Sequence, residues 1–226
     1  MKGQPSKVQT DKAVQTQGDG AGPRYHRIYS VDLPVTFERA QKTMHELMVN
    51  PNAFTPELIA TFEKTRGAEN DLQVDDEFLV RISGPWNGPV RVTQVGAASF
   101  TLVTLQGHLE AGQIQFSLHS RDDGHARFVI ESFTRSKDFL VNFIYDKLRF
   151  AQFMQSEMWQ LVCENFAENA MDLEKTKAIT TDKKDLPPVK ISTLRQDLES
   201  GIWEDVSDQV GAQGLNSEKH SEKHSD

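Results

Sequence analysis

Cysteine is nearly absent from this chain of 226 residues, which contains Cys163 alone. A single cysteine excludes a disulfide framework and a zinc site built from several thiolates. Cys163 lies in an apolar helical pattern, so we expect a buried thiol without a nucleophilic role. The chain has no run of about 18 apolar residues, and its N-terminus has no apolar segment of the signal-peptide kind. These absences predict a protein without a membrane span, located in the cytoplasm.

The chain also lacks the short motifs of several common enzyme classes. It has no Gly-x-Ser-x-Gly elbow, no phosphate-binding loop and no dinucleotide fingerprint. Its formal net charge of −8 argues against a function based on attraction to nucleic acid or anionic membranes. We therefore expect no cofactor and no nucleic-acid partner. An enzyme that uses scattered cavity residues is still compatible with the sequence.

Composition divides the chain into three parts. Residues 1–22 contain no aromatic residue and almost no large apolar one, so they cannot bury enough surface to offset the entropy of ordering. Residues 171–226 are similar, with two adjacent prolines and a polar repeat at the end. We expect both ends to be mostly disordered, with a short helix near 191–204. Residues 23–170 are predicted to form one domain.

The spacing of apolar residues predicts the order of elements in this domain. Residues 25–35 alternate as in a strand. Two short helices are predicted next, over 36–50 and 55–67, from their capping and breaking residues. From Glu77 the period becomes two and tight turns recur, which indicates an antiparallel meander. Residues 138–170 contain no Gly or Pro and have an apolar stripe at helical spacing, which predicts one long helix.

This order predicts an α+β fold of the helix-grip type. A curved antiparallel sheet would wrap around the long C-terminal helix, and the two short helices would follow the first strand. In such folds the sheet curls away from the helix at one end, and ligands prefer the cavity that results. The sequence therefore predicts a cavity for a small hydrophobic or amphipathic ligand.

Four segments resemble a known family. They are GPWNGPVRV (84–92), SFTLVTLQGHLEAGQIQF (99–116), RFVIESFTRS (127–136) and LVNFIYDKLRFAQFMQSEMW (140–159). These segments are similar to the domain-of-unknown-function family nineteen-ninety, within the Bet v 1-like, START-related (SRPBCC) helix-grip superfamily. The resemblance covers about residues 25–168. It implies the fold and a cavity, and it names no substrate.

The Gly-His-Leu-Glu-Ala-Gly stretch contains the most specific candidates for a site. On a regular strand, His108 and Glu110 share a face because side chains alternate. If that face lines the cavity, the pair could anchor a polar ligand, act as a general base with its carboxylate, or supply two metal ligands. A third metal ligand would have to come from His26, His119, His125 or Glu131.

The same stretch has a structural interpretation. Gly107 and Gly112 would mark bends or bulges in a strongly curled sheet. His108 and Glu110 would then hold the bend through hydrogen bonds to neighbouring loops. The sequence leaves this alternative open beside the functional ones.

Three further residues are candidates for ligand contact. Trp86, on a turn with Gly and Pro, could cover the mouth of the cavity or pack against the helix. Glu131 lies on the last strand and is a second carboxylate that His108 could use. Arg135, near the entry to the long helix, could bind a ligand carboxylate, pair with Glu110 or form a surface ion pair.

Three functions are compatible with these observations. The first is binding of a small hydrophobic or amphipathic ligand, with His108 and Glu110 as polar anchors. The second is an enzyme of the cyclase, hydrolase or isomerase type that uses His108 with Glu110 or Glu131. The third is binding of a protein partner through the C-terminal tail, where Trp203 stands among acidic residues.

Overall fold

The structure is a computed structural model, and it describes residues 12–82, 87–136, 145–172, 186–196 and 200–207. The strands are β1 (Ala21–Thr36), β2 (Ala60–Arg66), β3 (Glu77–Ile82), β4 (Asn87–Gly96), β5 (Ser99–Thr104), β6 (Glu110–Ser120), β7 (His125–Ser136), β8 (Val189–Gln196) and β9 (Trp203–Asp205). The helices are α1 (Phe37–Val49) and α2 (Tyr145–Asp172), with two short 3-10 turns, η1 (Gln17–Asp19) and η2 (Pro51–Ala53).

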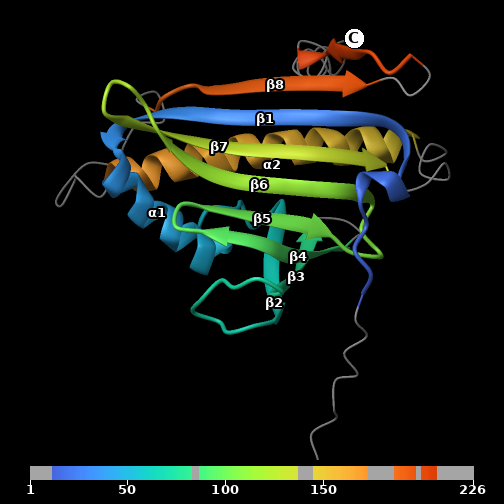
Figure 1. Ribbon diagram of the computed structural model, residues 1–226, viewed down its shortest axis with the longest axis horizontal. Helices are drawn as coiled ribbons and strands as arrows, with labels where there is room; N and C mark the ends of the chain where they lie inside the picture. Colours follow the sequence, from blue (N-terminus) through green and yellow to red (C-terminus); the bar gives the residue numbers. More distant parts are fainter. Residues whose placement is uncertain (1–11, 83–86, 137–144, 173–185, 197–199, 208–226) are drawn as a thin grey trace, which may run out of the picture.

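The described strands form one antiparallel sheet in the order β2-β3-β4-β5-β6-β7-β1-β8-β9. Figure 1 shows the long strands β8, β1, β7 and β6 side by side, with α2 running behind β1 and β7. The fold is therefore α+β, with a mostly antiparallel sheet and two helices. We call the sheet face that contacts α2 the inner face.

The first strand and the first helix lie close to the predicted positions. Alternate residues of β1 are buried on the inner face, and Tyr29 and Leu33 are almost fully inaccessible. α1 buries Met44 and Leu47 among other residues, as its apolar stripe predicts. α2 ends at Asp172, and residues 137–144 at the predicted start of this helix lie outside the described part.

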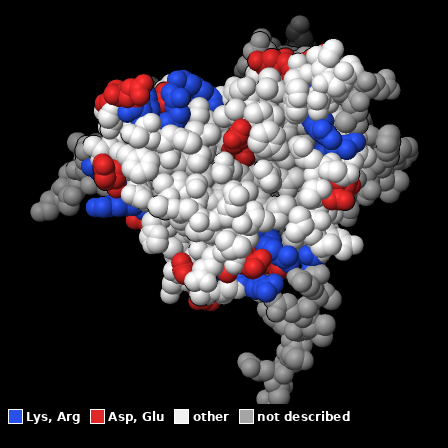
Figure 2. Space-filling view, viewed as in Figure 1, with Lys and Arg blue, Asp and Glu red and all other residues white. Residues whose placement is uncertain are grey.

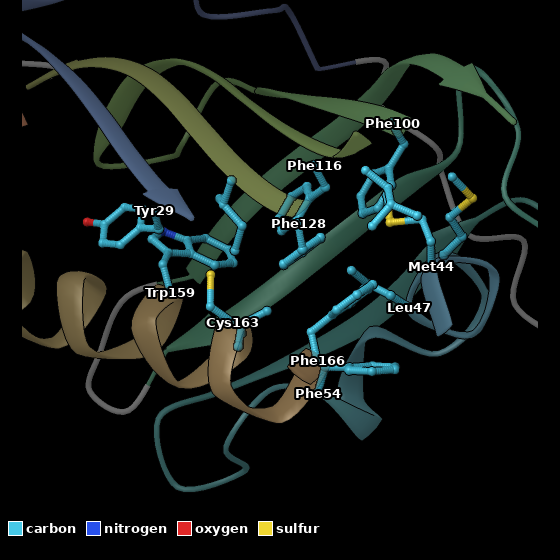
Figure 3. Close-up of a cluster of buried hydrophobic side chains, with 14 of the residues drawn as sticks. Tyr29, Met44, Leu47, Phe54, Phe100, Phe116, Phe128, Trp159, Cys163 and Phe166 are labelled. Atoms are coloured by element: carbon cyan, nitrogen blue, oxygen red, sulfur yellow. The ribbon is translucent and has the colours of Figure 1, made fainter. Parts of the chain in front are cut away.

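The core lies between the inner face and α2 (Figure 3), and much of it is aromatic. Phe128 of β7 stacks on Phe166 of α2, with ring centroids 3.9 Å apart. Phe116 meets Trp159 edge to face at 5.4 Å. Cys163 is fully buried on the same helix, which confirms the expected buried thiol, and burial raises its pKa.

Contacts from the α1 region hold the C-terminal half of α2. The last turn of α2 contains no basic residue, although its exposed carbonyls favour a cation there. Arg39 of α1 supplies one, because its Nε donates a hydrogen bond to the carbonyl of Ala170 at 3.0 Å. Asn165 of α2 donates to the carbonyl of Phe54 at 2.8 Å. These bonds tie α2 to α1 and to the segment between α1 and β2.

The helix predicted over 55–67 is wrong, because residues 60–66 form β2. Ala60 and Phe62 alternate with polar residues and are buried against the core, which is a period of two. The side chain of Asn52 accepts a hydrogen bond from the backbone N–H of Phe62 at 2.7 Å and donates to its carbonyl at 2.9 Å. Pairing with β3 and the two hydrogen bonds from Asn52 outweigh the local preference of these residues for a helix.

The predicted disorder of residues 1–22 does not apply to residues 12–22. Residues 12–16, which we call the strap, insert between the ends of β5 and β6. The N–H of Gln15 donates to the carbonyl of Thr104 at 2.8 Å, and the N–H of Gly112 donates to the carbonyl of Gln15 at 3.1 Å. Main-chain hydrogen bonds, which depend little on side-chain type, order this segment without large apolar side chains.

The short helix predicted near 191–204 is also wrong. Residues 189–196 form β8, which pairs with β1 over residues 24–31, and β9 pairs with β8. The segment contains the alternating series Val189, Ile191 and Thr193, which faces the core from β8. The free edge of β1 offers a row of main-chain partners, so pairing as a strand is more favourable for this segment than its weak helical pattern.

Candidate functional site

The inner face changes from apolar to polar along the strands. The register places inner-face residues in rows across the sheet. One row contains Ile191, Tyr29, Ile130, Phe116 and Phe100. The next row contains Thr193, Arg27, Ser132, Ile114 and Leu102. The third contains Arg195, Tyr25, Thr134 and Gly112. Polar residues therefore gather at the end of the face near the strap.

An apolar pocket lies where α1, α2 and strands β2, β3, β5 and β6 meet. The lining residues are Leu47, Met48, Pro51, Thr55, Phe62, Leu72, Phe78, Phe100, Leu102, Phe116, Trp159 and Val162. All of them except Thr55 are apolar, and Figure 3 shows Leu47, Phe100, Phe116 and Trp159 converging between sheet and helix. The pocket volume is about 20 Å³, little more than one water molecule needs. A larger ligand would enter only if the walls moved.

A buried polar group occupies the other end of the inner face. Arg27 of β1 is 8% exposed, and its Nη1 donates to Thr134 Oγ1 at 2.9 Å. The same nitrogen lies 3.9 Å from Glu110 Oε1, and the guanidinium carbon lies 4.5 Å from the centre of the Tyr25 ring. Thr193 of β8, directly opposite Arg27, is also buried. We call Arg27, Glu110, Thr134 and Thr193 the Arg27 cluster.

The hydroxyl of Thr193 is one of several buried polar atoms, Thr43 Oγ1 among them, for which the described residues provide no hydrogen-bond partner. Thr193 is 1% exposed, and no hydrogen-bond partner for its Oγ1 is found in the described structure. A buried hydroxyl without a partner costs free energy that most native proteins avoid. This orphaned group, on the residue that pairs with Arg27 across the sheet, makes the Arg27 cluster a candidate for a ligand contact.

Arg27 and Thr193 were missed among the sequence candidates, although a signal for Arg27 existed. Arg27 stands in phase with Tyr29, Val31 and Leu33, so the alternation of β1 places a charged residue on an otherwise apolar face. Thr193 had no comparable signal, because its segment was expected to be a helix. Its position depends on β8 pairing with β1.

His108 lies in a turn and not on the regular strand that was predicted through this region. β5 ends at Thr104 and β6 begins at Glu110, with a turn between them at Gly107, whose φ is +106°. The backbone N–H of Glu110 donates to His108 Nδ1 at 2.9 Å, so the ring proton of neutral His108 resides on Nε2. Burial lowers the pKa of His108, and the nearby Glu110 carboxylate opposes that shift.

This geometry favours the structural interpretation of His108. Its ring bonds to the main chain of Glu110 and lies over Gly88, where an added Cβ would be 2.7 Å from His108 Nε2. Gly112 is a second constrained position, with φ of +153° and an ideal Cβ only 2.0 Å from the Phe133 carbonyl oxygen. Both features shape the end of the hairpin. Glu110, in contrast, reaches the inner face and belongs to the Arg27 cluster.

Glu131 and Arg135 lie on the outer face, because they alternate with the inner residues of β7. Glu131 Oε1 is 2.6 Å from His26 Nε2, and the His26 ring stacks on Phe133 with centroids 4.2 Å apart. Arg135 donates to the carbonyls of Gly22 and Gln17, so it fixes the segment that follows the strap. Neither residue shares a site with Glu110.

The remaining candidates do not assemble with these residues. Trp86 lies outside the described residues. His119 bonds to Ser117 at 2.9 Å, and His125 lies 3.5 Å from Asp123 near the β6–β7 turn. In the part of the chain that the structure describes, no three His, Cys, Asp or Glu side chains are arranged to hold a metal ion.

The charged residues on the viewed face form small separate groups and no continuous patch of one sign (Figure 2). None of the described helices combines the length and the hydrophobicity that crossing a membrane requires.

Comparison with known proteins identifies one sequence family. The family described as "Domain of unknown function (DUF1990)" matches residues 23–161. No curated protein matches the chain. Similar solved structures include the crystal structure of Ara h 8.0201, with 11% identity and a TM-score of 0.44. Another is a structural genomics target from Nitrosospira multiformis, with 10% identity and a TM-score of 0.45. Each likeness covers 66% of this chain and 99% of the other chain.

Proposed function

The chain belongs to the DUF1990 family of domains of unknown function, and on that premise we propose that it binds a small hydrophobic or amphipathic ligand between the sheet and α2. One observation carries the proposal. The inner face joins an apolar pocket to a buried polar cluster that contains an orphaned hydroxyl. Ligand sites in proteins commonly combine an apolar lining with a few placed polar groups.

The small volume of the pocket has a consequence for how a ligand would bind. At about 20 Å³ it accommodates no chain of several carbon atoms until side chains or α2 shift. Met48 and Trp159 line the pocket, and the unbranched thioether of Met48 adapts to new shapes at low cost. We therefore expect binding to require an opening step, with association slower than about 10⁵ M⁻¹s⁻¹.

Native mass spectrometry of protein purified from its own host tests this function. We expect a bound small molecule whose mass disappears when the pocket is filled by Val162→Phe. The matched control is Val129→Phe, at a position on the outer face of β7. A wild-type protein that carries no small molecule and binds none from a panel of medium-chain alcohols and acids would contradict the proposal.

No observation on the described residues favours the enzyme alternative. That alternative is a cyclase, hydrolase or isomerase that uses His108 with Glu110 or Glu131. His108 Nδ1 is engaged by the main chain of Glu110, and Glu131 lies on the other side of the sheet. General-base catalysis needs the base within hydrogen-bond reach of a reacting group, and the described residues offer no such arrangement around His108.

Binding of a protein partner by the C-terminal segment is a second candidate function. Ile202 and Trp203 remain 61% and 42% exposed, which is unusual for such side chains next to an ordered strand. We expect the double variant Ile202→Ser and Trp203→Ser to lose any partner that co-purifies with the wild type. Identical co-purifying proteins would remove this candidate. Location in the cytoplasm stays a prediction from the sequence.

A further inference from the structure

We propose that the Arg27 cluster binds the head group of the ligand and selects a neutral hydroxyl group over a carboxylate. This inference rests on the proposed function, because it concerns the polar end of the same site. Three features of the inner face support it: the distance between cluster and pocket, the hydrogen-bonding groups of the cluster, and its balance of charge.

The cluster and the pocket lie on the same face of the sheet, and Arg27 is two to three strands from the pocket residues of β6 and β5. Leu102 lines the pocket and lies in the same cross-strand row as Arg27. Phe116, another lining residue, lies in the adjacent row. Phe116 lies on β6, two strands from Arg27 on β1 and one row along, so the strand spacing of about 4.8 Å and a step of about 7 Å along the strand put the two backbone positions about 12 Å apart. An amphipathic molecule of the length of octan-1-ol can therefore reach from the aromatic wall to the Arg27 cluster.

The cluster contains a hydrogen-bonding group that has no partner among the described residues, the Thr193 hydroxyl. Arg27 donates from Nη1 to Thr134 Oγ1, and a guanidinium carries five N–H donors in all. The hydroxyl of Thr193, the residue that pairs with Arg27, finds no partner in the part of the chain that the structure describes, and it can both donate and accept. A ligand hydroxyl could accept from Arg27 and bond to Thr193, which would satisfy the orphaned group.

The charge balance disfavours an anionic head group. Glu110 Oε1 lies 3.9 Å from Arg27 Nη1, and their side chains are 17% and 10% exposed, so the two charges compensate each other where water is scarce. A ligand carboxylate would bring a second negative charge to one guanidinium. Arg195 lies in the next row, but it is exposed and its charge is screened by water. A neutral hydrogen-bonding group avoids this repulsion.

The test compares two probes that share one carbon chain, octan-1-ol and octanoate, by calorimetric titration of the full-length protein at neutral pH. For the wild type we expect octan-1-ol to bind about tenfold more tightly than octanoate, because of the Glu110 charge. Glu110→Gln leaves Arg27 uncompensated and should reverse this order. The matched control is Glu131→Gln, which removes a carboxylate from the outer face and should keep the wild-type order.

Thr193→Val supplies a second test that does not depend on charge. Valine has nearly the same shape but no hydroxyl, so the variant should unfold at a higher temperature than the wild type, since an unsatisfied buried group is removed. The same variant should bind octan-1-ol several-fold more weakly. Loss of affinity together with gain of stability separates a ligand contact from a merely structural position.

The outcomes distinguish this inference from the function on which it rests. Equal affinities for the two probes in the wild type, or an order unchanged in Glu110→Gln, would overturn the head-group assignment while leaving ligand binding intact. Unchanged octan-1-ol affinity in Thr193→Val would do the same for the role of the hydroxyl. A wild type that binds neither probe would overturn both the inference and the proposed function.

Discussion

The protonation of His108 depends on the turn that contains it. Its Nδ1 accepts the Glu110 N–H, and its half-buried ring lies against Gly88. Burial holds the pKa of His108 below its ordinary value of 6.5. The unfolded chain therefore binds a proton more readily than the folded protein does. The stability linked to this group is fully present above pH 6.5 and declines as the pH falls below it.

We expect His108→Gln to lower the free energy of unfolding at neutral pH by about 1 kcal/mol, because the turn loses a partly buried hydrogen bond. The variant should also lose the part of the pH dependence that lies below pH 6.5. Urea denaturation across this range measures both effects. His125→Gln, at an exposed residue, is the control. The same slope in His108→Gln and the wild type would show that His108 does not titrate as described.

Gly112 occupies a position that should tolerate no other residue. Its φ of +153° and the closeness of the Phe133 carbonyl leave no room for a Cβ atom. Gly112→Ala should therefore lower the stability by more than about 3 kcal/mol or prevent folding. Gly124→Ala is the control, because Gly124 also has a positive φ but has open space around it. We expect it to cost about 1–2 kcal/mol by thermal denaturation. Equal losses would refute the steric argument.

At the level of single residues, the sequence singled out the Gly-His-Leu-Glu stretch but did not predict which of its side chains faces the core. Gly107 lies in a turn, as the structural interpretation predicted, whereas Gly112 lies within β6 at a φ of +153° without a shift in the β6–β7 register. Whether Glu110 or Glu131 faces the core depends on the register of β6 and β7, and one residue of shift would exchange the faces. No local pattern encodes that register, so both carboxylates remained candidates until the pairing was known.

Among the elements, β8 has the clearest consequence for stability. It covers β1 along residues 24–31 and lies outside the family match, which ends at residue 161. Lys190 of β8 also bonds to Asp32 at 2.9 Å, and Arg127 holds the pKa of Asp32 far below its usual range. Without β8, the main-chain groups of β1 would be exposed as an unpaired edge.

A chain that ends at residue 185 should therefore melt at least about 5 °C lower than the full chain and associate through the edge of β1. A chain that ends at residue 207 retains β8 and β9 and should behave as the full chain does. Thermal denaturation and light scattering after size-exclusion chromatography measure the two effects. An unchanged melting temperature and a monomeric state for the shorter chain would show that β8 contributes little.

Elements with strong local periodicity were predictable, and those that depend on distant partners were not. α1 follows from its own apolar stripe. β2, the strap and β8 each form because another strand or loop offers main-chain partners far away in sequence. A pattern read within a short window contains no information about those partners, which explains why two of these segments were predicted as helices and one as disordered.

For the molecule as a whole, entry of a ligand into the pocket requires that the sheet and α2 separate transiently. Cys163 reports on this motion, because it is fully buried on α2 beside the pocket residue Val162 and burial raises its pKa. We expect a thiol reagent to modify Cys163 far more slowly in the native protein than in urea, and more slowly still with saturating octan-1-ol. Native labelling as fast as that of an unfolded chain would contradict a closed core.

The architecture of the whole molecule was predictable in outline, because an antiparallel meander before a long amphipathic segment has few ways to bury its apolar faces. The amount of free space was not predictable. It depends on how side chains such as Phe116 and Trp159 interlock across the interface, which only coordinates reveal.

Intermolecular nuclear Overhauser effects with octan-1-ol test the central proposal most directly. The account predicts contacts from the methyl end of the chain to Trp159 and Phe116, and contacts from the methylene next to the hydroxyl to Thr193. Contacts confined to exposed residues such as Ile202 and Trp203, or no contacts under saturating conditions, would contradict a ligand site between the sheet and α2.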